Sequence, residues 1–187
     1  MDNRAQKLDH AESIAKVRRW LQEVVIDYNL CPFAQREFDA GRVSYRVFEG
    51  RKSKAAIAAL LDELHVLDEH DNIETTLLIL VDGWRDFYDY LALLDAAQQA
   101  LEAAGYEGIY QLASFHPDYV FADEAVDDAS NYTNRSPLPL LHLLRESSIA
   151  RAIASNPNID QIPDRNKQLV RAKGADFWRG LLATIDS

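Results

Sequence analysis

The chain has 187 residues, of which 30 are acidic and 20 are lysine or arginine, so its formal net charge is −10. A chain this acidic lacks the cationic field that attracts nucleic acid or an anionic membrane surface, and we expect neither as a partner. The composition, 48% hydrophobic and 27% charged with seven glycines and six prolines, is typical of a soluble globular protein. We expect residues 1–187 to form a single domain.

In the first half of the chain, helix and strand patterns alternate. Apolar residues spaced three and four apart predict an amphipathic helix over residues 14–28. A period of two predicts a half-exposed strand over residues 43–47. Ser53 is expected to cap the next helix, whose apolar face continues to Leu67. The continuous apolar run over residues 75–81 is typical of a central strand covered on both faces.

The next segments predict a long helix, a third strand and an irregular loop. We expect Asp82 to cap the helix and Gly105 to end it, with a strand over residues 109–114. Residues 115–134 show neither the helical spacing of three and four nor the strand period of two. An irregular segment of about twenty residues is more often a functional loop than a passive connection.

Two helical regions complete the prediction. Ser136 followed by Pro137 has the pattern of a helix cap with proline at the first helical position, which predicts a helix running toward Ile153. A last helical region begins near Pro163 and is interrupted around Gly174.

The order of these elements predicts the fold class. Strand, helix, strand, helix, strand implies parallel or mixed pairing, because each crossover helix returns the chain to the same end of the sheet. We therefore expect an α/β or α+β fold. It should contain a small mixed or parallel sheet of three to four strands, crossover helices and a C-terminal helical segment.

The charges are unevenly distributed along the chain. Residues 62–95 contain ten acidic residues and one arginine, chiefly on the outer faces of two predicted helices. Residues 131–173 contain seven basic residues and three acidic ones, a net charge of +4. This cationic segment favours a small anionic ligand. Its basic residues are Arg135, Arg145, Arg151, Arg165, Lys167, Arg171 and Lys173.

The densest run of polar residues able to bind or react follows the third predicted strand. His116 lies just beyond the carboxyl end of that strand, where open parallel sheets bind their ligands. The N–H groups of a helix opening at Ser136 would stabilise an anion there, beside Asn134 and Arg135.

In that predicted helix His142, Arg145 and Glu146 share a face. We expect Arg135 and Arg145 to clamp a phosphate or carboxylate, with His116 or His142 as general acid or base. The candidate catalytic residues are His116, Asp118 and His142. The candidate ligand-binding residues are Cys31, Asn131, Thr133, Asn134, Arg135, Ser136, Arg145 and Glu146.

Each of these features also has a purely structural interpretation. Ser136 can be a plain helix cap, His116 can shape a turn, and His142 with Arg145 can form a packed or solvated helix face. No His-x-x-x-His or Glu-x-x-His spacing accompanies the nearby carboxylates, so we predict no required metal. No cofactor-binding motif is visible, and the cofactor stays unknown.

Cys31 leaves two interpretations open. Residues 30–33 are superficially similar to the Cys-Pro-aromatic turn of thioredoxin-like proteins, but no second cysteine lies two residues on, where Ala34 stands. The thiol is either a buried or site-lining group, or a redox or nucleophilic one.

Two features predict a cytoplasmic location. Cys31 is the only cysteine, so no intrachain disulfide can form. Residues 1–16 carry charges throughout, without the apolar core of a signal peptide, and no stretch approaches the ~20 apolar residues of a membrane span.

Several motifs resemble those of a bacterial family grouped as domain of unknown function 1415. They cover residues 29–34 (NLCPFA), 113–119 (ASFHPDY) with 121–122, 131–137 (NYTNRSP) and 141–146 (LHLLRE). The resemblance extends over nearly the whole chain and implies a single-domain cytoplasmic bacterial protein. It implies no activity, substrate or residue role.

Three functions follow from the residues. The first is a hydrolase or transferase acting on a small anionic metabolite that carries phosphate or carboxylate. The second is a non-catalytic anion-sensing or partner-binding protein that uses the same residues. The third is a thiol-dependent oxidoreductase using Cys31. A homo-oligomer is compatible with the sequence.

Overall fold

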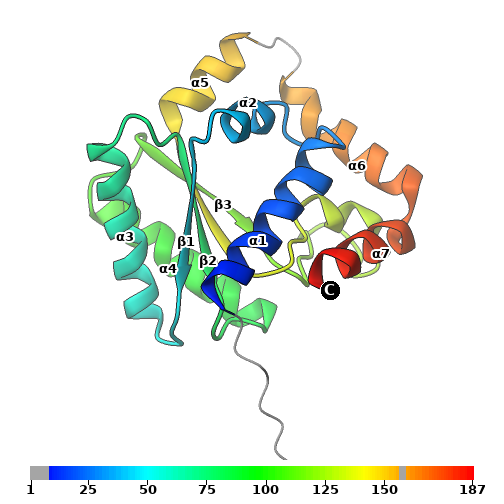
Figure 1. Cartoon of the computed structure of the whole chain (residues 1–187), viewed down its shortest axis with the longest axis horizontal. Helices are drawn as coiled ribbons and strands as arrows, with labels where there is room; N and C mark the ends of the chain where they lie inside the picture. The colour runs from blue at the N-terminus through cyan, green and yellow to red at the C-terminus, as the bar shows by residue number, and fades with distance from the viewer. Residues whose placement is uncertain (1–8, 156–158) are drawn as a thin grey trace, which may run out of the picture.

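The computed structural model describes residues 9–155 and 159–187 and contains a four-stranded sheet between two layers of helices (Figure 1). The strand order is β1-β2-β4-β3, and β4 runs antiparallel to both of its neighbours while β1 and β2 are parallel. The fold is therefore α+β with a mixed sheet, which confirms the predicted class. The strands are Val43–Phe48 (β1), Thr75–Leu80 (β2), Tyr110–Phe115 (β3) and Leu140–Arg145 (β4).

Seven α-helices lie within these described residues. They are His10–Trp20 (α1), Ala34–Asp39 (α2), Ser53–Glu69 (α3), Phe87–Ala103 (α4), Glu146–Ser155 (α5), Ile162–Lys173 (α6) and Ala175–Asp186 (α7). The first of them continues into a π-helical segment, Leu21–Ile26 (η1), and two short 3-10 turns occupy Ala129–Thr133 (η2) and Ile159–Gln161 (η3). Within the described part of the chain, no helix combines the length and the apolarity that a membrane crossing requires.

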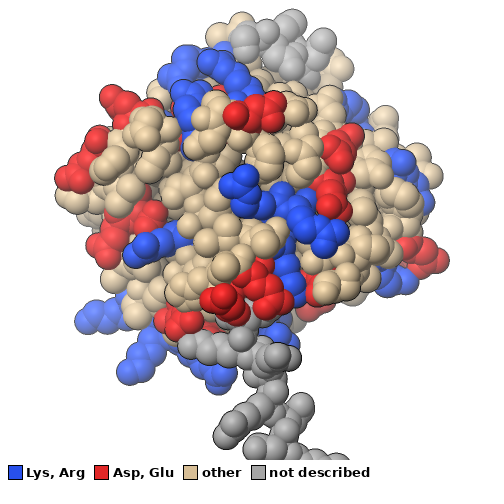
Figure 2. Space-filling view, in the orientation of Figure 1, with Lys and Arg blue, Asp and Glu red and all other residues tan. Residues whose placement is uncertain are grey.

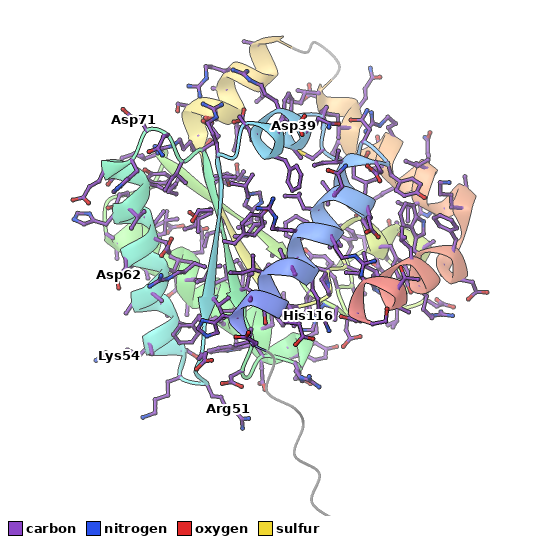
Figure 3. The ribbon with its side chains drawn as sticks, viewed as in Figure 1. Asp39, Arg51, Lys54, Asp62, Asp71 and His116 are labelled. Carbon is purple, nitrogen blue, oxygen red and sulfur yellow. The ribbon has the colours of Figure 1, made fainter. Side chains whose placement is uncertain are left out.

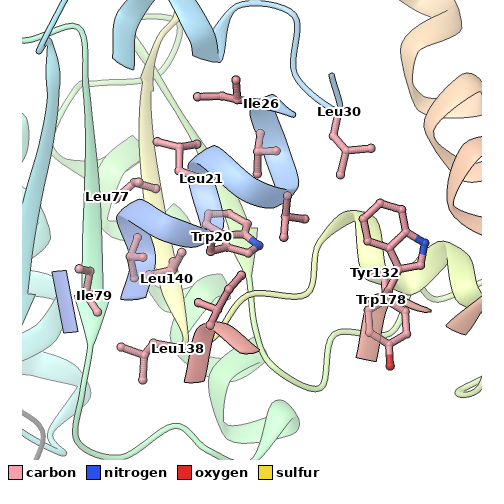
Figure 4. Packing of buried hydrophobic residues seen from close by; sticks show 14 of the residues in the cluster. Trp20, Leu21, Ile26, Leu30, Leu77, Ile79, Tyr132, Leu138, Leu140 and Trp178 are labelled. Atoms are coloured by element: carbon pink, nitrogen blue, oxygen red, sulfur yellow. The ribbon is translucent and has the colours of Figure 1, made fainter. Parts of the chain in front are cut away.

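The hydrophobic core has one half on each face of the sheet. On one face, helices α3 and α4 pack over Leu78 and Leu80 of β2 and over Leu141 of β4. On the other face, α1, η1, α6 and α7 pack over Leu77 and Leu140, with Trp20 and Trp178 among the largest buried side chains (Figure 4). Successive side chains of a strand point to opposite faces, and every residue of β2 is buried. The prediction of a central strand covered on both faces is confirmed.

The ends of the crossover helices differ slightly from the predicted ones. Asp86, not Asp82, caps α4, and its carboxylate accepts hydrogen bonds from two backbone N–H groups of the first turn. Between Asp82 and Asp86 the chain turns, with Gly83 (φ 77°) and Trp84 (φ 47°) in the left-handed region of backbone conformation. Gly105, at φ 83°, follows the end of α4 as predicted. Helix α3 has Lys52 at its cap position, so Ser53 is its first helical residue and not its cap.

The predicted helix from Pro137 to Ile153 is wrong in its first half. Residues 140–145 form β4 in the middle of the sheet, and α5 begins only at Glu146. A short leucine-rich run suits a buried strand and a buried helix equally, because its apolar side chains can cover both faces of either element. Ser136 therefore caps no helix, and its buried hydroxyl donates to the carbonyl oxygen of Leu138 at 2.6 Å.

The C-terminal helices pack against each other across a glycine. Gly174, at φ 82°, separates α6 from α7, as the predicted interruption required. The indole N–H of Trp178 on α7 donates to the carbonyl oxygen of Val170 on α6 at 3.0 Å. This pair closes the core on the side of the sheet that carries the candidate site.

Candidate functional site

A cleft of about 280 Å³ lies between the turn that follows η1, the carboxyl end of β3 and helix α6. Its walls are mainly apolar, with a few polar side chains among them. The lining residues are Val25, Leu30, Cys31, Phe115, Phe121, Thr133, Asn134, Ile162, Pro163, Asn166 and Lys167. Concave, mainly apolar surfaces with a few polar groups are the usual form of small-molecule sites. Three of the predicted ligand-binding residues, Cys31, Thr133 and Asn134, come together here.

Helix α6 fixes the turn that forms one wall of the cleft. Asn29 adopts φ 51°, which reverses the chain after η1 and brings Leu30 and Cys31 toward α6. The buried amide of Asn166 donates to the carbonyl oxygen of Leu30 at 2.6 Å. Arg165 donates to the carbonyl oxygen of Asn29. These side-chain bonds to the backbone hold the wall in place.

Asn131 shapes the irregular loop that forms the opposite wall. Its buried side chain accepts from the N–H of Phe121 at 3.0 Å and donates to the carbonyl oxygen of Ala125 at 2.8 Å. Two neighbouring residues that line the cleft also bond to the backbone. The side-chain amide of Asn134 donates to the carbonyl oxygen of Ser114 at 3.1 Å, and the hydroxyl of Thr133 donates to that of Ser130 at 2.9 Å. Asn131, predicted to bind ligand, thus supports the wall behind the cleft.

Ion pairs tie the same loop to helix α6. One oxygen of the Glu124 carboxylate accepts from Lys167 at 2.8 Å and the other from Arg171 at 2.6 Å. Arg171 also contacts Asp128 at 2.9 Å. The hydrogen bond from Arg171, reinforced by Ser130, holds the pKa of the Asp128 carboxyl well below its ordinary value. The negative charges of Glu124 and Asp128 in this loop are therefore balanced by the positive charges of Lys167 and Arg171 on α6.

His116 lies at the carboxyl end of β3, as predicted, but both of its ring nitrogens bond to backbone groups. Nδ1 accepts from the N–H of Asp118 at 3.0 Å, which leaves Nε2–H to donate to the carbonyl oxygen of Trp84 at 2.9 Å. The ring is fully buried and packs against Phe87 and Tyr90, and this burial lowers its pKa. His116 joins two loops, while the side chain of Asp118 is exposed at the surface.

Arg135 braces the irregular loop from within. Its guanidinium donates to the carbonyl oxygens of Tyr119 at 3.2 Å and Val126 at 3.1 Å, and it lies 4.4 Å from the ring centre of Tyr132. The indole of Trp20 donates to the backbone oxygen of Arg135 at 2.9 Å. The guanidinium is thus held by the loop and does not line the cleft.

Arg145 does not approach Arg135 or His116. In the register of the sheet Leu140 pairs with Phe115, whereas Arg145 pairs with Tyr110 at the other end of β3. Five strand residues separate the two ends by roughly 16 Å. Arg145 donates to the carbonyl oxygens of Leu67, near the end of α3, and of Ile73, just before β2. Figure 3 labels Asp71, from the connection between these two residues, at the upper left and His116 below the centre.

The predicted arginine clamp is therefore not assembled. In a helix, His142 and Arg145 would share a face, but three residues apart in a strand they point to opposite faces. Glu146 begins α5, at the same end of the sheet as Arg145, and its N–H donates to the carbonyl oxygen of Ile109 at 2.9 Å.

His142 faces the helices α1 and η1 from the middle of the sheet. Its Nε2 lies 2.7 Å from the hydroxyl of Thr75, which itself donates to the carbonyl oxygen of Leu143. Nε2 therefore carries the proton. Burial lowers the pKa of His142 to about 4, so the ring is neutral at neutral pH. The ring lies behind Phe115, at 6.1 Å between ring centres, and does not line the cleft.

Comparison with known proteins identifies the family. The model of a family described as protein of unknown function, DUF1415, matches residues 12–180. The chain belongs to the DUF1415 family. Neither a curated protein nor a solved structure matches it.

The DUF1415 protein has the charges of its cationic segment engaged internally. The partners are backbone oxygens for Arg135, Arg145 and Arg165, carboxylates for Arg151, Lys167 and Arg171, and aromatic rings for Lys173. Figure 2 shows acidic and basic side chains interspersed over the face in view. Residues 131–173 therefore offer an anion less positive charge than their composition predicted.

Cys31 lines the cleft of the DUF1415 protein, and the residue is half-buried. Burial raises the pKa of this thiol, against the smaller opposite effect of the backbone N–H groups of Phe33 and Ala34. The thiol is therefore protonated at neutral pH. Among the described residues, no three His, Cys, Asp or Glu side chains gather to hold a metal ion; the absence of a metal requirement stays a prediction.

Sequence reasoning missed the wall that α6 of the DUF1415 protein contributes. Asn166 and Lys167 line the cleft together with Ile162 and Pro163. A signal was present, because Asn166 lies four residues before Val170 and so places an amide on the buried face of an amphipathic helix. A polar residue at such a position requires a specific partner.

Proposed function

We propose that this DUF1415 protein binds a small molecule in the cleft, as a ligand-binding or sensing protein. The cleft itself supports this proposal: it is concave, mainly apolar, and built from segments that buried amides fix in place. A preorganised cavity avoids the cost of ordering its walls when a ligand binds.

Binding is favoured over catalysis by the chemistry of the lining. No histidine, aspartate or glutamate of the described residues lines the cleft, and both ring nitrogens of His116 are engaged. A general acid or base must reach the proton that it transfers. Hydrolase or transferase activity on an anionic metabolite, with His116 or His142 as acid or base, thus stays the second proposal.

The third hypothesis, a thiol-dependent oxidoreductase, gains less support. The nucleophile in such chemistry is a thiolate, and burial keeps the Cys31 thiol protonated. We assign Cys31 to the wall of the cleft. We further propose a single-domain, cytoplasmic and bacterial protein that binds neither nucleic acid nor membranes, on the strength of its charge, its single cysteine and the family resemblance.

A neutral aromatic probe tests the binding function. We expect naphthamide, titrated into isotope-labelled protein, to shift the amide resonances of cleft residues. Ile162→Trp fills the cleft and should weaken binding by about tenfold or more, an amount expected when a ligand loses its apolar contacts. Ile153→Trp is the matched control, because Ile153 is 50% exposed on α5 and lies outside the cleft.

Two results would reject this function. One is that no naphthyl compound, whether naphthamide, naphthoate or naphthyl phosphate, shifts a cleft resonance. The other is that Ile162→Trp, shown to be folded by its spectrum, binds naphthamide as tightly as the wild type.

A further inference from the structure

We infer that the cleft selects ligands carrying a carboxylate or a phosphate group, and that Lys167 makes this selection by exchanging its internal partner Glu124 for the ligand. The inference rests on the proposed binding function and specifies its ligand class. It assigns the anion to Lys167 on α6, not to the two arginines of the predicted clamp.

Lys167 is the one basic residue among the described residues that line the cleft. Its ammonium group has three N–H donors, of which one is directed to Glu124 at 2.8 Å. Nζ also lies 5.2 Å from the ring centre of Phe121, another lining residue. The side chains of Lys167 and Glu124 are only 32% and 14% exposed, so their charges are less screened than at an open surface.

The other polar side chains of the cleft already have protein partners. Asn134 donates to Ser114, Asn166 donates to Leu30, and the hydroxyl of Thr133 donates within its own turn. A ligand therefore finds its main unused donors on Lys167. Because the rest of the lining is largely apolar, a charge-assisted bond at this point would dominate the polar recognition of a ligand.

Glu124 can release Lys167 without losing all of its partners. Its two carboxylate oxygens bond to different cations, one to Lys167 and the other to Arg171 at 2.6 Å. Arg171 is anchored in turn on Asp128 at 2.9 Å. When a ligand anion takes the place of Glu124 at Nζ, the carboxylate stays paired with Arg171, and only one ion pair is exchanged.

This exchange explains why the cleft would discriminate by charge. A neutral ligand can accept a hydrogen bond from an N–H of Lys167 that Glu124 does not use, but it has no charge to pair with the ammonium group, so it gains only that bond and the apolar contacts. An anionic ligand forms its own ion pair with Lys167, and the cost of releasing Glu124 is limited because Glu124 keeps its pair with Arg171. The advantage over a neutral ligand is the part of the new ion pair that exceeds this cost. Glu124 therefore acts as a competitor that weakens the binding of every anion.

Three probes of one ring system test the inference: naphthoate, naphthyl phosphate and neutral naphthamide. We expect the wild-type protein to bind at least one anion about tenfold more tightly than naphthamide, as one partly exposed charge-assisted bond would give. The anion with the larger preference identifies the ligand class.

Two substitutions separate the roles of the pair. Lys167→Met keeps the apolar stem, and we expect it to abolish the preference for anions over naphthamide, with cleft resonances that still shift on naphthamide addition reporting an intact cleft. Glu124→Gln removes the competitor and should raise the preference several-fold, with naphthamide affinity again reporting an intact cleft. Lys173→Met is the matched control, because Lys173 lies on the same helix over the rings of Tyr28 and Phe177.

The inference fails if naphthamide binds in the cleft and neither anion binds more tightly, or if Lys167→Met leaves the preference unchanged. A Glu124→Gln variant that binds naphthamide normally but anions less tightly would also overturn it. In these cases the binding function itself survives. If none of the three probes binds the wild type, the proposed function falls, and the inference falls with it.

Discussion

The side-chain amide of Asn166 donates to the backbone oxygen of Leu30 at 2.6 Å, joining helix α6 to a turn 136 residues earlier in the chain. Both groups are buried, and the bond holds one wall of the cleft against α6. The same residue pair thus connects the stability of the fold to the shape of the candidate site.

Replacing this amide should therefore affect stability and binding together. Asn166→Ala leaves the buried oxygen of Leu30 without a donor, and we expect the free energy of unfolding to fall by about 1–3 kcal/mol. Naphthamide affinity should fall as well, because the wall is released. Urea unfolding and the probe titration check both effects. Gln168→Ala, at an exposed position of the same helix, is the control and should change neither quantity.

The two arginines of the predicted clamp should behave differently from each other. Arg145→Met removes donors from backbone oxygens near Leu67 and Ile73, at the end of the sheet away from the cleft. We expect a loss of about 1–3 kcal/mol in stability with no change in probe affinity. Arg135→Met loosens the loop that carries Phe121 and should weaken probe binding. Equal losses of affinity in both variants would instead support the clamp.

How far the sequence predicts this protein depends on the element. The strand over residues 75–80 and the glycine that ends α4 were predictable, since a continuous apolar run and a C-terminal glycine each have one common structural cause. Residues 140–145 were not, because leucines in a short run satisfy a helix and a buried strand alike. The strand conformation is favoured because, without residues 140–145, one edge of β2 and one edge of β3 would have no hydrogen-bonding partner.

That single ambiguity also determined what could be predicted of the site. Cys31, Thr133 and Asn134 do line one cleft, and the polar motif around them was visible in the sequence. Treating residues 140–145 as helical placed Arg145 beside His142, an arrangement that the strand excludes. The contribution of Asn166 and Lys167 depends on how α6 docks against distant segments, which local patterns do not contain.

Stability should depend on pH through the histidines at the sheet. Burial lowers the pKa of His142 to about 4 from an ordinary value of 6.5, and burial also lowers that of His116. Near pH 6.5 these histidines therefore bind protons in the unfolded chain but not in the folded chain. The stability that their neutral forms contribute is fully present above this pH and is lost as the pH falls toward about 4.

Urea unfolding across this pH range measures the effect. For His142 we expect a loss of about 1–3 kcal/mol, and His142→Asn should show a correspondingly smaller pH dependence. His65→Ala, on the exposed surface of α3, is the control. A wild-type stability that is constant from neutral pH to about pH 4.5 would contradict the lowered pKa values.

The thiol of Cys31 should react slowly in the folded protein. Because burial raises its pKa, we expect a disulfide reagent to modify it at least about tenfold more slowly than in urea, with a rate that rises toward alkaline pH. Naphthamide should slow the reaction further, since Cys31 lines the cleft. Cys31→Ser should still bind the probe; loss of binding would assign the thiol a larger role.

The position of β4 also constrains the order in which this protein can fold during synthesis. β4 is the last strand to be made, yet it occupies an interior position between β2 and β3. Until residues 140–145 have left the ribosome, β3 has no partner strand and β2 presents an open hydrogen-bonding edge. A nascent chain that pauses before this point carries the unpaired strand β3 and the open edge of β2, and exposed strand edges are where aggregation starts, so completion of the sheet waits for the C-terminal third of the chain.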